Sequence, residues 1–253
     1  KLGADGAAVD AMRGFLATVD MQGVIVIGEG EKDNAPMLYN GERVGNGVGP
    51  LCDIAVDPID GTSLTATGRL NALSMIAVAD RGSMLDASSV FYMNKLVAGN
   101  EGVGVLDIRL PIGENIRRLA KAKNKDVSDI VVAILDRPRH VGLIREVHEA
   151  GASTRLMLDG DVAGGIQAAM YGSRIDMCAG TGGSPEGIVT TCAIKALGGF
   201  IQGVLAPKDE AEKARGLAAG LKFDHVYEAD ELVASDNTIF VATGVTDGAL
   251  VQG

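Results

Sequence analysis

The sequence is poor in residues that cross-link small or secreted proteins. Its three cysteines, Cys52, Cys178 and Cys192, are scattered and include no Cys-x-x-Cys pair. This usage indicates neither a disulfide framework nor a thiolate metal site, and it favours a reducing cytoplasm. Tryptophan is absent and aromatic residues make up 4% of the 253 residues. With 47% hydrophobic residues, the composition still predicts a globular core and argues against disorder or a coiled coil.

Positive charge and long apolar runs are also scarce. Lys and Arg number 23 against 33 Asp and Glu, a net charge of −10, and no basic block occurs. We therefore expect no nucleic-acid partner and no membrane partner. No apolar run approaches the roughly 18 residues of a membrane span, and no leader segment is visible. The sequence also lacks G-x-G-x-x-G and Gly-Lys, which argues against dinucleotide and P-loop chemistry.

The apolar pattern divides the chain into two halves. Residues 1–110 are predicted to be mixed α+β, with a helix over 5–19 and strands over 24–27, 53–56 and 73–79. In residues 111–253 helix and strand alternate, which predicts βαβ units and a mostly parallel sheet. The expected helices there are 113–123, 139–150, 161–171 and 185–197, and the expected strands are 130–135, 154–158, 174–178 and 200–205. The fold class is therefore α+β or α/β.

Carboxylates follow two of the predicted strands. Gly28-Glu29-Gly30-Glu31 comes directly after strand 24–27, and Asp57-Pro58-Ile59-Asp60-Gly61-Thr62 comes at the end of strand 53–56. Such carboxylates can pool oxygen ligands for Mg²⁺ or Mn²⁺, whereas the histidines show no ligand spacing. Asp-Pro and Asp-Gly are also ordinary turn signals. Backbone N–H groups and hydroxyls at Gly61-Thr62-Ser63 could bind a phosphate oxygen, and this combination indicates metal-assisted phosphoryl hydrolysis.

These two motifs together resemble the metal-binding signature of the lithium-sensitive phosphatase superfamily, which includes inositol monophosphatases and fructose-1,6-bisphosphatases. Flanking segments resemble more specifically the class II, bacterial-type fructose-1,6-bisphosphatases. They are Ala4-Asp5-Gly6-Ala7-Ala8, Ala35-Pro36-Met37-Leu38-Tyr39, Arg137-Pro138-Arg139-His140, Asp159-Gly160-Asp161-Val162-Ala163 and Gly182-Gly183-Ser184-Pro185-Glu186-Gly187. The resemblance covers nearly the whole chain.

The resemblance implies a layered sugar-phosphatase fold and a set of site residues. The implied ligands of Mn²⁺ or Mg²⁺ are Asp5, Glu29, Asp57, Asp60 and Glu186. Thr62 would orient the attacking water and act with Asp57 and Asp60 in catalysis. The implied substrate-binding residues are Asp60, Gly61, Thr62, Tyr92, Arg137, Pro138, Arg139, Asp159, Gly160, Asp161 and Gly183. Arginine forks suit phosphate, and paired aspartates suit sugar hydroxyls.

Several of these residues also have local explanations. Arg137 and Arg139 open a helix, where a basic pair is commonly solvated, and Asp159 and Asp161 could cap the helix that follows. Glu186 lies in a first helical turn, where the helix dipole favours an acid. The roles of Glu31, Lys32 and Asp33 stay open.

The reaction implied by the resemblance is release of the 1-phosphate of fructose 1,6-bisphosphate, in gluconeogenesis. The alternatives are a sedoheptulose-1,7-bisphosphatase or a dual-specificity enzyme, then an inositol-phosphate phosphatase or a non-catalytic phosphosugar sensor. The family also implies a homo-oligomer, dimer or tetramer. Family members extend further at both ends, so we expect this chain to be truncated there.

Overall fold

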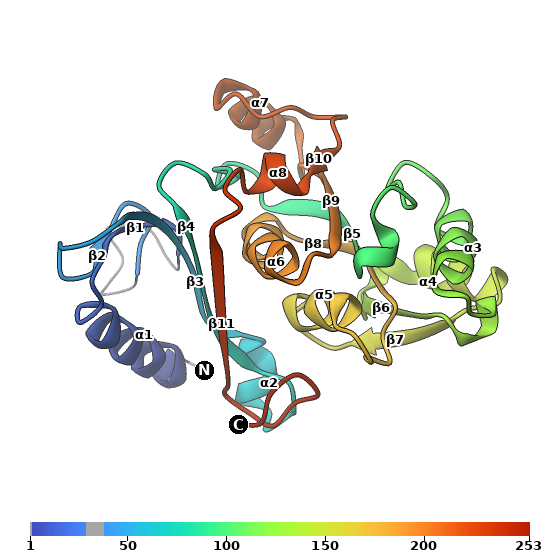
Figure 1. Cartoon of the computed structure of the whole chain (residues 1–253), viewed down its shortest axis with the longest axis horizontal. Helices are drawn as coiled ribbons and strands as arrows, with labels where there is room; N and C mark the ends of the chain where they lie inside the picture. The colour runs from blue at the N-terminus through green and yellow to red at the C-terminus, as the bar shows by residue number, and fades with distance from the viewer. Residues whose placement is uncertain (1, 29–37) are drawn as a thin grey trace. The chain divides into compact units, whose positions relative to one another are not determined.

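The computed structural model describes residues 2–28 and 38–253, and these residues form two compact units (Figure 1). The first unit comprises Lys1–Asp86 and Val233–Gly253, and the second comprises Ala87–Leu232. The expected division near residue 110 differs from this one. Strand β5 (Tyr92–Ala98) belongs to the second unit because it pairs with two strands of that unit, β8 (Met177–Gly183) and β9 (Phe200–Leu205).

The first unit is a five-stranded sheet with order β11-β4-β3-β1-β2. β1 and β3 are parallel, and the other neighbours are antiparallel. The last strand of the chain therefore completes a sheet begun by the first 80 residues. The elements are α1 (Leu2–Leu16), β1 (Gln22–Ile27), β2 (Arg43–Val44), β3 (Leu51–Asp60), α2 (Thr62–Ala66), β4 (Leu73–Asp80) and β11 (Thr238–Gly244).

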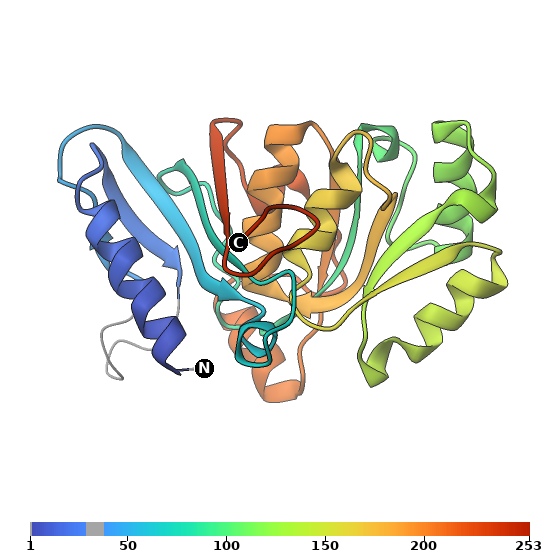
Figure 2. The ribbon, with the colours of Figure 1, turned by 90° about the horizontal axis from the view of Figure 1, so that it is seen from below.

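Helix α1 lies against this sheet (Figure 2). Val9, Met12 and Leu16 recur at helical spacing, so they share the face that is buried against Ile25 and Ile54 of the strands. The predicted helix over 5–19 is confirmed in type but lies three residues earlier, at Leu2–Leu16. Its first turn carries Asp5.

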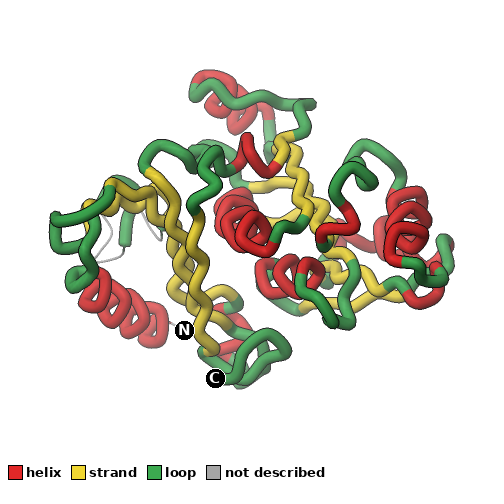
Figure 3. The backbone as a smooth tube through the Cα atoms, viewed as in Figure 1, coloured by secondary structure: helices red, strands yellow, loops and turns green. Residues whose placement is uncertain are grey.

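The second unit is a six-stranded sheet with order β10-β9-β5-β8-β6-β7. Its helices cover both faces, with α5 and α6 on one and α3 and α4 on the other (Figures 1 and 3). Besides β5, β8 and β9, its elements are η1 (Asn100–Gly102), α3 (Ile112–Lys123), η2 (Val127–Asp129), β6 (Val131–Leu135), η3 (Pro138–His140), α4 (Val141–Glu149), β7 (Ser153–Met157), α5 (Val162–Ala169), α6 (Ser184–Leu197), α7 (Glu210–Ala218), β10 (Tyr227–Glu228) and α8 (Ala229–Leu232).

The expectation of a mostly parallel sheet needs correction. β6, β7, β8 and β9 do run in one direction, because β6 is parallel to β7 and β8, and β8 and β9 are both antiparallel to β5. β5 separates β8 from β9, and β10 runs against β9, so three of the neighbouring pairs are antiparallel. The alternation of helices and strands in the sequence correctly predicted that β6, β7, β8 and β9 run in one direction. It did not predict that β5 lies between β8 and β9 in the sheet.

Two other boundaries differ from the sequence prediction. The Asp-Pro and Asp-Gly signals do not end β3, which continues to Asp60 with a shift in its register against β4 between Asp57 and Asp60. β8 starts at Met177 and continues through glycines to Gly183, beyond the predicted 174–178, because β5 supplies a partner along its whole length. No helix of the described residues is both long enough and apolar enough to cross a bilayer.

Candidate functional site

The first unit carries the predicted residues Asp5, Asp57, Asp60, Gly61 and Thr62. Asp57 and Asp60 lie at the end of β3, where the register shift changes the alternation of the side chains. Gly61 follows with a φ of 81°, and α2 begins at the next residue, Thr62. This φ is a conformation that L residues rarely adopt, so the abrupt change from strand to helix favours glycine; a β-carbon there would also lie 2.8 Å from Leu64 Cδ1.

Two buried aspartates of this unit differ in their partners. The carboxylate of Asp53 accepts hydrogen bonds from the backbone N–H groups of Gly82 and Ser83, at 2.8 and 3.0 Å, so it is satisfied within the protein. Oδ1 of Asp5 is buried, yet it has no hydrogen-bond partner among the residues that the structure describes. A buried carboxylate oxygen without a donor is costly unless something else, such as a cation, compensates it.

The second unit contains a buried charged cluster formed by Lys95, Asp161 and Glu186. Lys95 Nζ lies 2.6 Å from Asp161 Oδ2, with side chains only 6% and 10% exposed, and it donates to Gly183 O at 3.1 Å. Burial alone would lower the pKa of Lys95, but Asp161 and Glu186 outweigh burial and raise it. Lys95 is therefore a fixed positive charge between two carboxylates.

Glu186 lacks an adequate partner in this cluster. Its Oε2 is buried and has no hydrogen-bond partner within the described residues. Burial raises the pKa of Glu186, and Asp161 adds to this effect while Lys95 opposes it. The carboxylate covers Gly183, where a β-carbon would lie 1.7 Å from Oε2. The cluster carries two acids and one base, so a bound cation would stabilise it.

The arginines predicted to bind substrate follow β6, Arg137 at the N-cap of η3 and Arg139 within η3. Arg137 Nη2 donates to Asp159 Oδ1 at 2.9 Å, which joins two predicted residues from different loops. Arg139 donates through Nε and Nη2 to Thr181 O, at 3.1 and 2.8 Å. Its guanidinium carbon also lies 5.0 Å from the ring centroid of Tyr92, another predicted residue. Neither arginine is simply solvated.

The remaining predicted residues, Pro138, Gly160 and Asp161, lie in the segments that follow β6 and β7. Pro138 begins the 3-10 helix η3, and Gly160 has a φ of 68° between Asp159 and Asp161. Asp161 occupies the N-cap position of α5, but its side chain makes no capping hydrogen bond to that helix and pairs with Lys95 instead. The capping explanation therefore does not account for Asp161.

Asp5 in the first unit and Glu186 in the second each present a buried carboxylate oxygen that has no donor among the described residues, and each such oxygen is a fitting ligand for a hard divalent cation. Within residues 2–28 and 38–253, no three His, Cys, Asp or Glu side chains gather into a metal-binding group. Glu29, another predicted ligand, lies outside the described residues, as do Glu31, Lys32 and Asp33.

Sequence reasoning missed Lys95 and Thr181. Lys95 interrupts the apolar pattern of β5, and a lysine in a strand is by default assigned to solvent. Thr181 lies in a glycine-rich stretch that reads as a turn. One signal in the sequence could have indicated that Lys95 is buried. It lies between Met93 and Leu96-Val97, in a segment too apolar to be the exposed edge strand of a sheet.

Comparison with known proteins matches residues 1–253 to the family described as bacterial fructose-1,6-bisphosphatase, glpX-encoded. The class 2 fructose-1,6-bisphosphatase of Haemophilus influenzae is 44% identical, over all of this chain and 80% of that protein. Fructose-1,6-bisphosphatase 1 class 2 of Escherichia coli K12 is 45% identical, over 99% of this chain and 78% of that protein. The family is one of metal-dependent phosphatases. The chain belongs to the bacterial, glpX-encoded fructose-1,6-bisphosphatase family.

Proposed function

We propose that this chain hydrolyses the 1-phosphate of fructose 1,6-bisphosphate to give fructose 6-phosphate and phosphate, a step of gluconeogenesis. We infer this activity from the two class 2 fructose-1,6-bisphosphatases that are 44% and 45% identical to this chain over nearly its whole length. One structural observation supports it most directly. Three predicted substrate residues from separate elements contact the same short stretch, Thr181–Gly183. Tyr92 of β5 pairs with Gly183, and Arg139 of η3 donates to Thr181 O. Asp161 is joined to Gly183 O through Lys95.

We assign Asp5, Glu29, Asp57, Asp60 and Glu186 as ligands of Mn²⁺ or Mg²⁺. The support is the oxygen character of this set and the two buried oxygens, on Asp5 and Glu186, that have no hydrogen-bond partner among the described residues. A divalent ion held by these residues would lower the pKa of a water and would neutralise charge on the phosphoryl oxygens. Phosphate monoesters hydrolyse so slowly that the hydroxyl of Thr62 alone cannot provide the acceleration.

The protein's own groups bind and orient the substrate. Arg137 and Arg139 offer planar guanidinium donors to the phosphate that is not cleaved. Asp159, held by Arg137, and Asp161, held by Lys95, present carboxylate oxygens to sugar hydroxyls. Thr62, at the start of α2 and beside Gly61, is assigned to orient the attacking water through its hydroxyl.

The finer assignments are part of the same proposal. Among sugar bisphosphates we favour fructose 1,6-bisphosphate, with sedoheptulose 1,7-bisphosphate as the second substrate to be measured. We also propose a homo-oligomer, dimer or tetramer, in the cytoplasm, on the family resemblance and on cysteine usage.

The test is phosphate release from both sugar bisphosphates with Mn²⁺, with Mg²⁺ and with EDTA. We expect turnover with metal only, and a loss of kcat of about 100-fold or more in Thr62→Ala, the scale of a positioned proton-transfer group. Thr67→Ala is the matched control, because Thr67 is the C-cap residue directly after the same helix and its hydroxyl bonds only to backbone carbonyls in the described structure. A folded wild-type chain that releases no phosphate with either metal would overturn the activity, and full kcat in Thr62→Ala would overturn the role of Thr62.

A further inference from the structure

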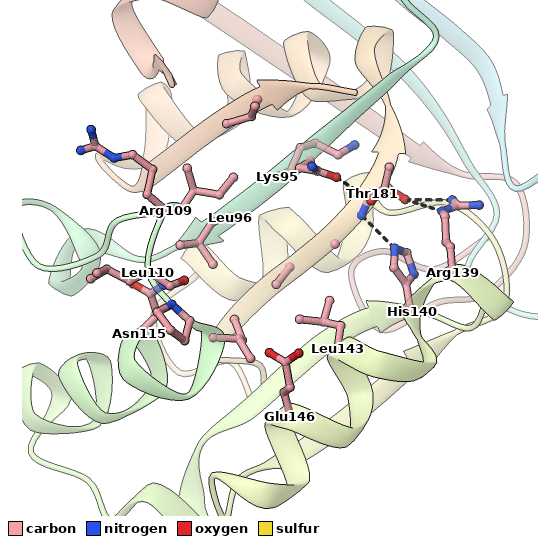
Figure 4. Close-up of a pocket in the computed structure, with 17 residues that line it drawn as sticks. Lys95, Leu96, Arg109, Leu110, Asn115, Arg139, His140, Leu143, Glu146 and Thr181 are labelled. Carbon is pink, nitrogen blue, oxygen red and sulfur yellow. Dashed lines mark hydrogen bonds between the residues drawn. The ribbon is translucent and has the colours of Figure 1, made fainter. Parts of the chain in front are cut away.

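His140 is a buried histidine for which the proposed mechanism has no direct use. It ends the Arg137-Pro138-Arg139-His140 motif, and only 3% of its surface is exposed. Its side chain lies in the wall of a pocket of about 490 Å³ on the α3 and α4 face of the second unit, beside Arg139 and Thr181 (Figure 4). Both ring nitrogens are occupied by backbone groups.

The two hydrogen bonds fix the state of the imidazole. Nδ1 lies 2.7 Å from Leu135 O, and Nε2 lies 2.8 Å from Thr181 N. A carbonyl can only accept and a backbone N–H can only donate, so the ring must carry its proton on Nδ1 and leave Nε2 as an acceptor. Burial lowers the pKa of His140, and the nearby Arg139 and Arg137 add to this against the opposing effects of Leu135 O and Asp161. The neutral ring that this geometry requires is thus favoured.

The ring replaces strand pairing at the point where two strands separate. β6 and β8 pair in parallel at Val132 with Met177 and at Ala133 with Cys178, and the pairing goes no further. The backbone N–H of Thr181, three residues beyond Cys178, bonds instead to the imidazole, whose other end holds the last residue of β6, Leu135. His140 is therefore a rigid spacer between the diverging ends of β6 and β8.

A glycine makes room for this spacer. Gly180 has a φ of 129°, a conformation that L residues rarely adopt. A β-carbon there would lie 2.9 Å from His140 Nε2 and 3.2 Å from Cε1. The backbone of β8 is thus shaped to admit the ring directly beside Thr181.

Thr181 passes this constraint to Arg139. While its N–H donates to His140, its carbonyl accepts both hydrogen bonds from the guanidinium of Arg139, and its Oγ1 donates to Asn94 Oδ1 at 2.6 Å. Arg139 also lies over Tyr92, whose partner across β5 and β8 is Gly183. The position of this arginine therefore depends on where Thr181 is held.

We propose that His140 is a positioning residue for substrate binding, which holds Thr181 and through it sets the guanidinium of Arg139. The inference rests on the proposed function, because it takes Arg139 to bind substrate. His140 does not itself touch the reacting atoms. Its loss should therefore raise KM for fructose 1,6-bisphosphate and change kcat little.

Two substitutions of His140 distinguish the hydrogen bond at Nδ1 from the hydrogen bond at Nε2. Asparagine places its amide the same number of bonds from Cα as Nδ1, so His140→Asn can keep the bond to Leu135 O and loses the acceptor for Thr181. Glutamine reaches as far as Nε2, so His140→Gln can restore that acceptor. We expect KM to rise about tenfold in His140→Asn, as for one lost buried hydrogen bond, and to stay within about twofold in His140→Gln.

A double-mutant cycle shows whether the effect passes through Arg139. Arg139→Ala should raise KM, and adding His140→Asn to it should raise KM no further, because the group being positioned is gone. Melting temperatures of all variants are measured alongside. Equal KM in His140→Asn and the wild type would overturn the inference. So would equal increases in both His140 variants that follow their melting temperatures, or additive effects in the cycle.

The outcomes distinguish this inference from the proposed function. No turnover by the wild-type chain would refute the proposed activity, and an unchanged KM in Arg139→Ala would refute the role of Arg139 in substrate binding. Either result would also refute the inference about His140. An increase in KM in Arg139→Ala without one in His140→Asn would remove the inference alone. The ¹⁵N shifts of His140, which report the protonated nitrogen, provide a readout independent of activity, and a proton on Nε2 would contradict the geometry.

Discussion

Replacing Lys95 with methionine tests the buried charged cluster. Methionine keeps most of the aliphatic side chain but removes the charge that faces Asp161 at 2.6 Å and Gly183 O at 3.1 Å. Asp161 and Glu186 are then two buried acids without a base. Breaking a buried ion pair on one side costs about 3–5 kcal/mol, because the remaining charge has lost its compensation. At roughly 2–4 °C per kcal/mol, the melting temperature should fall by about 6–20 °C.

The matched control is Lys195→Met. Lys195 Nζ lies 2.6 Å from Asp230, the same separation, but the side chain of Asp230 is 81% exposed. Because water can solvate that acid, the same substitution should cost about 1 kcal/mol or less.

Melting is followed by circular dichroism in EDTA, so that no metal ion compensates Glu186, and hydrogen exchange at β5 and β8 shows whether the second unit is affected. Adding Asp161→Asn to Lys95→Met should recover part of the loss. An equal or smaller loss in Lys95→Met than in Lys195→Met would refute the reasoning.

Two further predictions concern single acids. In EDTA at pH 7, Glu186→Gln should be more stable than the wild type. Because the pKa of Glu186 is raised in the folded protein, its contribution to folding stability is present below the ordinary pKa of 4.5 and is lost as pH rises. Melting curves from pH 4 to 8 check this, and a less stable variant at pH 7 would contradict it. Asp176 is 0% exposed and is held by Lys123 and Lys125, whose hydrogen bonds outweigh burial and lower its pKa. Asp176→Asn should therefore lower the free energy of unfolding by about 2 kcal/mol at pH 7, and this difference from the wild type should shrink as pH falls below the ordinary pKa of 3.8. Urea titrations at several pH values measure the difference, and a difference that does not change with pH would exclude this.

Local pattern predicted the elements whose residues lie next to one another in sequence. The helix carrying Val9, Met12 and Leu16, the strand Val131–Leu135 and the amphipathic helix Ile112–Lys123 all follow from periodicity. It did not predict the place of β5 in the sheet, which is set by partners about 80 to 110 residues away in β8 and β9. Nor did it predict that β3 continues past Pro58, since the neighbouring β4 maintains the strand against a local turn signal.

The candidate site divides in the same way. Motif spacing indicated Asp57, Asp60 and Thr62, which are local to one strand and the helix after it. Lys95 and Thr181 gain their roles only through contacts with residues from distant segments, namely Asp161 for the lysine and His140 for the threonine. A single sequence shows the residue types but not these pairings.

The return of the chain to its first sheet has a consequence for synthesis on the ribosome. β4 is complete at Asp80, but the strand that covers its outer edge, β11, emerges only after the whole of Ala87–Leu232 has been made. The second unit is one continuous segment, so it can fold while the first still exposes an unpaired edge, which is a template for wrong pairing. If that segment folds early, fewer flexible residues separate β4 from β11, and the entropy cost of bringing the two strands together is smaller. Ser235 and Asn237, just before β11, then donate hydrogen bonds to the carboxylate of Asp80 at the end of β4.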